Sequence, residues 1–184
     1  FYMSDICTQK ITENDKLLCD EGITESEVLD AIKKYKNGKS PGLDGIVPEF
    51  YKEFLNVIKR SFMKMVQDVF LCGELPGSMK KAVVTLIYEK GDKKLLSNYR
   101  PISLTNYDYK IIAFVLSMRL QLVIGNLIHS DQSGYIKGRF IGQNARLIND
   151  VYEYCETNNI EGAILNLDFE KAYDRLEWNF LIKA

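Results

Sequence analysis

The chain has 184 residues, of which 46% are hydrophobic and 27% are charged, and its 24 Lys and Arg nearly balance its 25 Asp and Glu. This composition is typical of a globular protein with a core and excludes a disordered or fibrous chain. Four scattered cysteines argue against a disulfide framework or a structural zinc site. The single histidine, His129, nearly excludes Ser-His-Asp and Cys-His catalysis.

No signal peptide opens the chain, and no uncharged stretch approaches the roughly 20 apolar residues of a membrane span. We therefore expect a reduced, soluble, intracellular type of protein with no membrane partner. The chain begins at Phe1 and stops at Ala184, inside a predicted helix. This favours a piece of a longer polypeptide.

The net charge of −1 conceals a strong pattern along the chain. Residues 1–30 and 147–184 carry net charges of −6 and −5, whereas residues 31–79 carry +3 and residues 80–146 carry +7. Two interpretations are open: charges scattered over a solvated surface, or a basic central region that meets phosphate beside an acidic segment that holds cations. Charge alone does not choose between them.

Helical patterns dominate the first part of the chain. A capping box at residues 24–27 predicts a helix start, and Asn37-Gly38 should close that helix. A second helix is predicted over residues 48–72, with Gly73 as its stop signal. The apolar residues expected on its buried face are Phe50, Phe54, Leu55, Ile58, Phe62, Met65, Val66 and Val69.

The pattern changes to strands at residue 82. Residues 82–88 are β-branched and apolar and predict a buried strand, and residues 99–104 read as a returning strand with Pro101 near an edge. Between them lies a charged turn that begins at Glu89. Together these segments predict a basic β-hairpin with a long tip.

The remaining segments alternate again. A helix is predicted over residues 107–128 with an apolar inner face, a glycine-punctuated loop over 134–139, and a further helix over 143–156. Residues 163–167 predict a buried strand that ends at Asp168, before an acidic cluster and a last helix. The residues expected inside the first of these helices are Ile111, Ile112, Val115, Leu116, Leu120 and Val123.

Asp168 is the first candidate for chemistry. A carboxylate at the end of a core strand lies where ligands bind, outside the carboxyl edge of a sheet. With Glu170 and Asp174 it supplies three carboxylates within seven residues, the ligand type that Mg²⁺ prefers. The alternatives are that Asp168 forms a turn, that Glu170 and Asp174 are solvated charges, or that Asp174 caps the following helix.

The second candidate is cationic. Lys90, Lys93, Lys94 and Arg100 belong to the hairpin, and a guanidinium within a strand needs an anionic partner or open water. Basic residues at 137–139 stand in the glycine loop, where backbone N–H groups can approach an anion. The alternative is that the lysines are simply solvated and the loop binds nothing. Taken together, these residues indicate a phosphate-handling, metal-dependent protein, and nucleic acid is one ligand of that chemistry.

Five stretches in order resemble the reverse transcriptase of non-LTR (LINE-type) retrotransposons. They are residues 38–46 with 49–52, 82–92, 98–104, 131–139 and 167–174. The resemblance covers roughly residues 24–184. It implies an α+β right-hand polymerase fold, with a poorly ordered flank at 1–23, fingers and palm edge at 24–160, and the start of the catalytic palm at 161–184.

The resemblance also implies an RNA-directed DNA polymerase, a nucleotidyltransferase that copies an RNA template from a DNA primer with dNTPs. Asp168 would bind two Mg²⁺ ions, for which Mn²⁺ can substitute, and the carbonyl of Phe169 would be a secondary ligand. Tyr173 would exclude a ribose 2′-hydroxyl, while Lys90 and Arg100 would clamp the incoming triphosphate. The residues placed near template or nucleic acid are Lys39, Lys93, Lys137 and Arg139. Further partners would be the rest of the palm and the thumb, and the expected location is intracellular, in the nucleus if the chain is part of an active element.

The chain departs from this family in several places. Tyr88-Glu89 stands where Pro-Lys is common, which removes a positive charge and weakens the assignment of Lys90; Phe140 replaces a usual Ser, and Tyr173 replaces the commoner Phe. No aromatic-Ala-Asp-Asp run occurs in the 184 residues, so we expect no polymerase activity from them alone. Two alternatives stay open: a degenerate mobile-element remnant that at most binds nucleic acid, and a metal-dependent nuclease or phosphatase built on Asp168 and Asp174.

Overall fold

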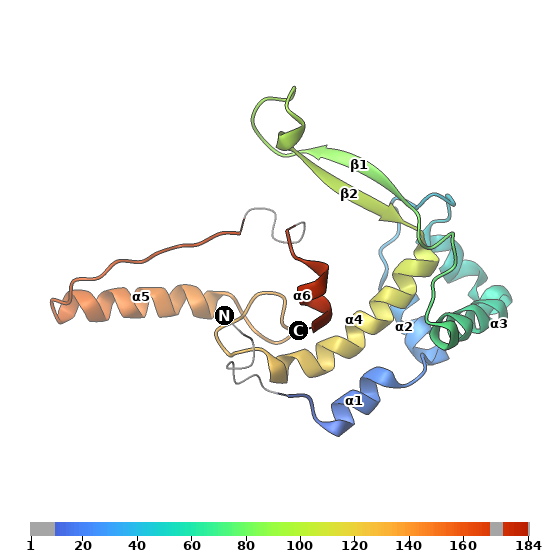
Figure 1. Ribbon diagram of the computed structural model, residues 1–184, viewed down its shortest axis with the longest axis horizontal. Coiled ribbons are helices and arrows are strands. Elements are labelled where there is room, and N and C mark those ends of the chain that lie inside the picture. The colour runs from blue at the N-terminus through green and yellow to red at the C-terminus, as the bar shows by residue number, and fades with distance from the viewer. Residues whose placement is uncertain (1–9, 170–174, 184) are drawn as a thin grey trace. The chain divides into compact units, whose positions relative to one another are not determined.

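The structure is a computed structural model that describes residues 10–169 and 175–183 (Figure 1). The chain divides into two compact units, Phe1–Gly138 and Arg139–Ala184. The first contains helices α1 to α4 and a β-hairpin, and the second contains helices α5 and α6. This mixture of helices and antiparallel strands agrees with the predicted α+β class.

Two helices with capping boxes open the first unit. α1 (Glu13–Asp20) starts at Thr12, whose hydroxyl accepts a hydrogen bond from the Asp15 amide, and it was not predicted from the sequence. α2 (Glu25–Lys34) starts at Thr24 with the reciprocal Glu27 contacts that the sequence predicted. In both helices the box satisfies amides that have no partner inside the helix.

α2 ends three residues before the Asn37-Gly38 stop that was predicted. The helix ends at Lys34, and Tyr35 is extended, with φ −66° and ψ 134°. The Tyr35 ring packs edge-on against Tyr107 at 5.4 Å, and its hydroxyl donates to the Lys110 carbonyl at 2.8 Å. These tertiary contacts outweigh the local stop signal. Burial raises the pKa of Tyr35 to about 12.

α3 (Pro48–Cys72) has the predicted bounds, and Gly73 ends it with a left-handed φ of 66°. Proline suits the first turn and glycine the position after the last. The predicted inner face is only partly right, because Phe50 and Phe54 are exposed and contact each other, with their ring centroids 5.1 Å apart and their planes tilted by 38°. The residues of α3 that are buried are Pro48, Tyr51, Leu55, Phe62 and Val66.

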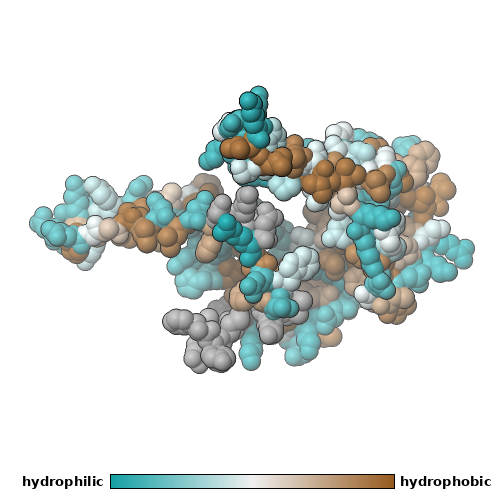
Figure 2. Space-filling view, turned by 45° about the horizontal axis from the view of Figure 1, so that its top comes forward, coloured by the Kyte–Doolittle hydropathy of each residue, from teal (hydrophilic) through white to brown (hydrophobic). Residues whose placement is uncertain are grey.

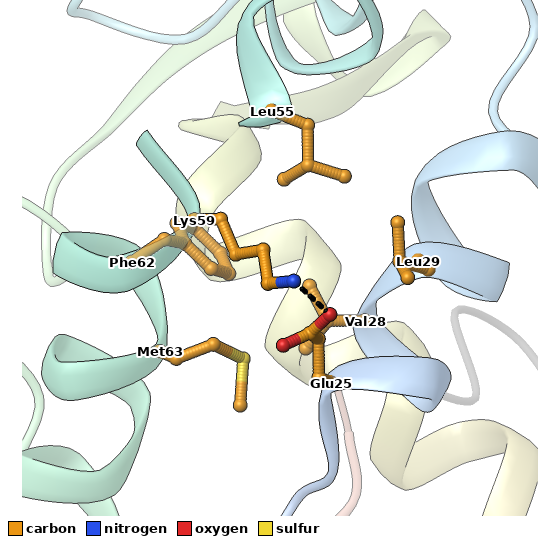
Figure 3. A pocket seen from close by; sticks show the side chains of 7 residues that line it. All are labelled: Glu25, Val28, Leu29, Leu55, Lys59, Phe62 and Met63. Carbon is orange, nitrogen blue, oxygen red and sulfur yellow. Dashed lines mark ion pairs between the residues drawn. The ribbon is translucent and has the colours of Figure 1, made fainter. Parts of the chain in front are cut away.

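α2, α3 and α4 (Tyr107–Leu127) share one apolar core. Its most buried residues include Ala31, Val66, Ile111 and Val115. Figure 3 shows where α2 faces α3: a Glu25–Lys59 ion pair lies across apolar side chains around a cavity of about 10 Å³. That volume holds about one water molecule, so the gap belongs to the packing and is not a nucleotide site.

α4 is the central helix of this core. Ile111, Ile112, Val115 and Val123 are buried as predicted, whereas the predicted inner residues Leu116 and Leu120 are exposed. By length and composition alone, this helix of 21 residues is long and apolar enough to cross a membrane, unlike what the sequence led us to expect. Its buried Arg119 pairs with Glu27 of α2, which is the behaviour of a core helix.

The β-hairpin has the predicted strands. β1 (Ala82–Tyr88) and β2 (Tyr99–Thr105) pair antiparallel, with Ala82 opposite Thr105 and Tyr88 opposite Tyr99. The prediction that β1 is buried is wrong, since all seven of its residues are exposed. Among the described residues no third strand pairs with these two. Figure 2 shows apolar side chains along the strands and hydrophilic ones at the tip.

The second unit contains α5 (Gly142–Thr157) and α6 (Trp178–Lys183). α5 agrees with the predicted helix but buries no residue. The prediction of a buried strand at residues 163–167 is wrong for this structure, where they are exposed and unpaired. A strand requires a neighbour for its backbone hydrogen bonds, and the described part of the chain supplies none there.

Candidate functional site

The tip of the hairpin is held by side-chain hydrogen bonds to its own backbone. Three side chains donate to tip carbonyls: Tyr88 to Gly91 at 2.7 Å, Tyr99 to Lys93 at 2.9 Å, and Asn98 to Asp92 at 2.8 Å. Gly91 has a φ of 91°, which favours glycine. The tip is therefore a defined loop that can present its charged side chains in fixed places.

Two of the predicted cations have partners on the hairpin. The Arg100 guanidinium donates from Nη2 to Oε1 of Glu89 at 2.6 Å. The ammonium of Lys93 lies 5.4 Å from the centre of the Tyr88 ring, within the range of a cation–π interaction. Lys90 is exposed on the same tip. The structure thus brings Lys90, Lys93 and Arg100 together on one short loop and its two strand ends.

The loop that carries Lys39 lies beside the base of the hairpin. Its Gly38 amide donates to Oε1 of Glu49 at 2.5 Å, and this bond holds the pKa of Glu49 below its usual value. Gly42 lies so close to Asn106, directly after β2, that an added Cβ would be 2.3 Å from the Asn106 Oδ1. Lys39 itself is exposed.

The glycine loop at residues 134–139 follows α4 and its backbone is sharply turned. Tyr135 and Gly138 have positive φ values of 63° and 83°, and Gln121 of α4 donates to the Tyr135 carbonyl at 3.3 Å. Lys137 is exposed, and Arg139 is the first residue of the second unit. The loop therefore ends the first unit with a basic residue accessible to an anion.

Asp168 and Phe169 are exposed in the second unit, in a segment without regular structure. Their carboxylate and carbonyl oxygens are of the kind that hard cations such as Mg²⁺ prefer. No group of three acidic, His or Cys side chains gathers within the ranges that the structure describes. Glu170, Tyr173 and Asp174 lie outside the described residues.

Sequence reasoning missed the residues that shape the tip. It treated Glu89 only as a lost positive charge, although Glu89 is the partner that Arg100 needed. Tyr88 was noted only as a departure from the family pattern and Tyr99 only as the start of a strand, yet their opposed rings lie 5.6 Å apart and their hydroxyls fix the loop. Their symmetrical places at the two strand ends were a usable signal, because residues that close a hairpin face each other.

Comparison with known proteins gives a consistent result. Residues 88–184 match the family model described as "Reverse transcriptase (RNA-dependent DNA polymerase)". The chain is 39% identical over 172 residues to "Transposon TX1 uncharacterized 149 kDa protein" of Xenopus laevis, an alignment that covers 94% of this chain and 13% of that protein.

Two further relatives are more distant. The chain is 27% identical over 155 residues to "Retrovirus-related Pol polyprotein from type-1 retrotransposable element R1" of Bradysia coprophila, covering 83% of the chain and 15% of that protein. It is 28% identical over 154 residues to "Retrovirus-related Pol polyprotein from type-2 retrotransposable element R2DM" of Drosophila melanogaster, covering 84% and 14%. The chain thus spans only about a seventh of these relatives.

Proposed function

Because the chain belongs to the reverse transcriptase family, in its non-LTR retrotransposon branch, we propose that it is the fingers and first palm segment of an RNA-directed DNA polymerase. In this proposal residues 24–160 form the fingers and palm edge of a right-hand fold, and residues 161–184 begin the catalytic palm. The observation that carries it is the family match across 88–184, which includes both the basic hairpin tip and Asp168.

The hairpin tip supplies the proposed contacts to the triphosphate. Arg100 and Lys90 meet phosphate oxygens of the incoming dNTP, and the tip is held in shape by the Tyr88 and Tyr99 hydroxyls. A guanidinium suits this task since its planar fork matches two phosphate oxygens. Lys39, Lys93, Lys137 and Arg139 are proposed to contact the template backbone, where each cation adds affinity that salt weakens.

Asp168 and the carbonyl of Phe169 are proposed to hold the catalytic Mg²⁺. When bound, two Mg²⁺ ions would lower the pKa of the primer 3′-hydroxyl and balance the charge of the triphosphate and leaving pyrophosphate. Asp168 by itself supplies one of the carboxylates that such a site needs. We therefore expect the 184 residues alone to bind template and nucleotide but not to extend a primer.

The test uses a polypeptide that carries these residues and continues into an aromatic-Ala-Asp-Asp turn. Asp168→Asn should reduce extension of an oligo(dT) primer on poly(rA) at least about a hundredfold, because it removes a metal ligand. Template binding should stay the same. Asp150→Asn, which removes an exposed carboxylate of α5, is the matched control and should retain activity. Extension by the Asp168→Asn variant at the normal rate would refute the assignment.

Tyr173 is proposed to exclude ribonucleotides by filling the space of the 2′-hydroxyl. In the same polypeptide, Tyr173→Ala should raise the incorporation of rNTPs relative to dNTPs, and Tyr173→Phe should leave the ratio unchanged. The measurement is competition between dTTP and UTP on one template. An unchanged ratio in the Ala variant would show that another residue selects the sugar.

A further inference from the structure

We propose that Glu89 is a built-in competitor for the phosphate that Arg100 binds, and that it sets how tightly the hairpin tip holds its ligand. The ligand chemistry is a phosphate group, from either a nucleoside triphosphate or a nucleic-acid backbone. This inference rests on the phosphate-binding role proposed for Arg100.

The hairpin register places the two side chains together. Ile87 stands opposite Arg100, and Glu89 lies two residues beyond Ile87, so its side chain falls on the same face as that of Arg100. The Glu89 amide donates to the Asn98 carbonyl at 3.0 Å, which extends the strand pairing by one residue and holds the Glu89 backbone beside β2. The 2.6 Å contact with Arg100 therefore follows from the register of the strands.

The pair is built to exchange rather than to hold the fold. Its contact is a single hydrogen bond from Nη2, and the side chains of Arg100 and Glu89 are 67% and 49% exposed. Exposed pairs of this kind contribute little to stability. A phosphate can offer two parallel acceptors to the guanidinium and so can replace one carboxylate oxygen.

A second arginine–glutamate pair in the same unit shows the contrast. Arg119 contacts Glu27 through two hydrogen bonds of 2.6 and 2.8 Å, and its side chain is only 6% exposed. No ligand could displace Glu27 without disrupting the core. Arg100 has the opposite arrangement. Its partner anion is the Glu89 carboxylate, and the guanidinium is exposed enough for a phosphate to reach it.

The competitor should favour ligands that carry more charge. A ligand must displace the Glu89 carboxylate to reach Arg100, and a more highly charged phosphate gains more from the neighbouring lysines Lys90, Lys93 and Lys94. Removal of the Glu89 charge should therefore tighten binding through Arg100, and salt should reduce the gain because exposed charges are screened.

The experiment measures binding of two probes to the 184-residue chain: dTTP, and a fluorescein-labelled oligo(rU) of about 20 nucleotides. The variants are Glu89→Gln, Arg100→Gln and the double variant, at about 50 and 300 mM salt. Glu89→Gln should tighten binding about two- to fivefold at low salt. Arg100→Gln should weaken binding, and the double variant should bind about as weakly as Arg100→Gln alone. Glu74→Gln, which breaks the exposed Glu74–Lys80 pair away from the tip, is the matched control and should change nothing.

Each outcome separates the two proposals. If Glu89→Gln tightens the binding of dTTP alone, the phosphate bound by Arg100 is that of a triphosphate. If it tightens the binding of oligo(rU) alone, the phosphate is that of the nucleic-acid backbone. Either result supports the role of Glu89 as a competitor. If Arg100→Gln weakens binding but Glu89→Gln does not tighten it, the competitor is refuted and the role of Arg100 stands. If Arg100→Gln has no effect, both proposals fail. A gain from Glu89→Gln that persists in full without Arg100 would also overturn the inference, because Glu89 would then act only through its general charge.

Discussion

Arg119 is the residue on which the first helices depend most. Its Nε and Nη2 bind both oxygens of Glu27, Nη2 also donates to the Gly22 carbonyl at 3.0 Å, and Nη1 donates to the carbonyls of Cys19 and Glu21. One buried cation therefore satisfies the end of α1, the linker that follows it, and the capping carboxylate of α2. Neither the pair nor its burial could be predicted from sequence, since the two partners are 92 residues apart.

Glu27→Gln should destabilise the chain by about 2–4 kcal/mol at pH 7, because it leaves the buried guanidinium without its counter-charge. Glu25→Gln is the matched control: it breaks the exposed Glu25–Lys59 pair two residues earlier in the same helix and should cost less than about 1 kcal/mol. Urea unfolding followed by circular dichroism measures both. Equal losses for the two variants would show that burial of Arg119 does not matter.

The same carboxylate predicts a pH dependence. Hydrogen bonding to Arg119 lowers the pKa of Glu27 from 4.5 to about 2. Since the folded-state pKa lies below the unfolded one, the stabilisation is complete above pH 4.5 and is lost as the pH falls towards 2. The difference in unfolding free energy between the wild type and Glu27→Gln should therefore shrink across this range. A constant difference would contradict the linkage.

At the scale of elements, local signals predicted both ends of α3, the start of α2 and the bounds of β1, although they missed α1 and the end of α2. The proline and glycine that bound α3, the capping box of α2 and the β-branched run of β1 act within a few residues, so the sequence contains all that they need. Burial is different, because it depends on what packs against an element. The exposed faces of β1 and the unpaired segment at 163–167 have no partner in the described part of the chain, and sequence patterns could not reveal that.

Gly42 lets the loop between α2 and α3 pack closely against the start of α4. Asn106, the residue before α4, accepts from the Asp44 amide and donates to the Ser78 carbonyl, both at 3.4 Å. Gly42 lies against it, and an added Cβ would be 2.5 Å from the Asn106 backbone nitrogen. Gly42→Ala should therefore cost about 1–3 kcal/mol through overpacking. Thermal unfolding measures this loss.

Gly77→Ala is the matched control for this substitution. It adds the same methyl group to a turn where nothing lies within 4 Å and the φ is not positive. We expect it to change stability by less than about 0.5 kcal/mol. If Gly42→Ala were as well tolerated as Gly77→Ala, the loop would not be fixed against Asn106.

At the scale of the whole molecule, the residues with proposed roles belong to two different units. Lys90 and Arg100 belong to the unit with the packed core, while Asp168 belongs to the other unit, where its segment is exposed. The residue types and their order along the chain were enough to indicate the family. The structure around Asp168 could not be predicted in the same way, because the apolar run at 163–167 reads as a strand in the sequence but is exposed and unpaired in the described part of the chain.

This division predicts an uneven distribution of stability along the chain. The amides of α4 should be strongly protected from hydrogen exchange, because residues such as Ile111 and Val115 are at the centre of the core. α5 has 16 residues and buries none of them, and a helix of that length is marginal in water when nothing packs against it. We expect its amides to be protected less than about tenfold, and those of residues 161–169 to exchange as an unfolded chain does.

Mass spectrometry of peptic fragments measures all three segments at once, with the exposed hairpin strands β1 and β2 as an internal reference for pairing without burial. Protection of α5 equal to that of α4 would contradict the prediction and would mean that its exposed apolar residues Leu147, Ile148 and Val151 are covered in solution.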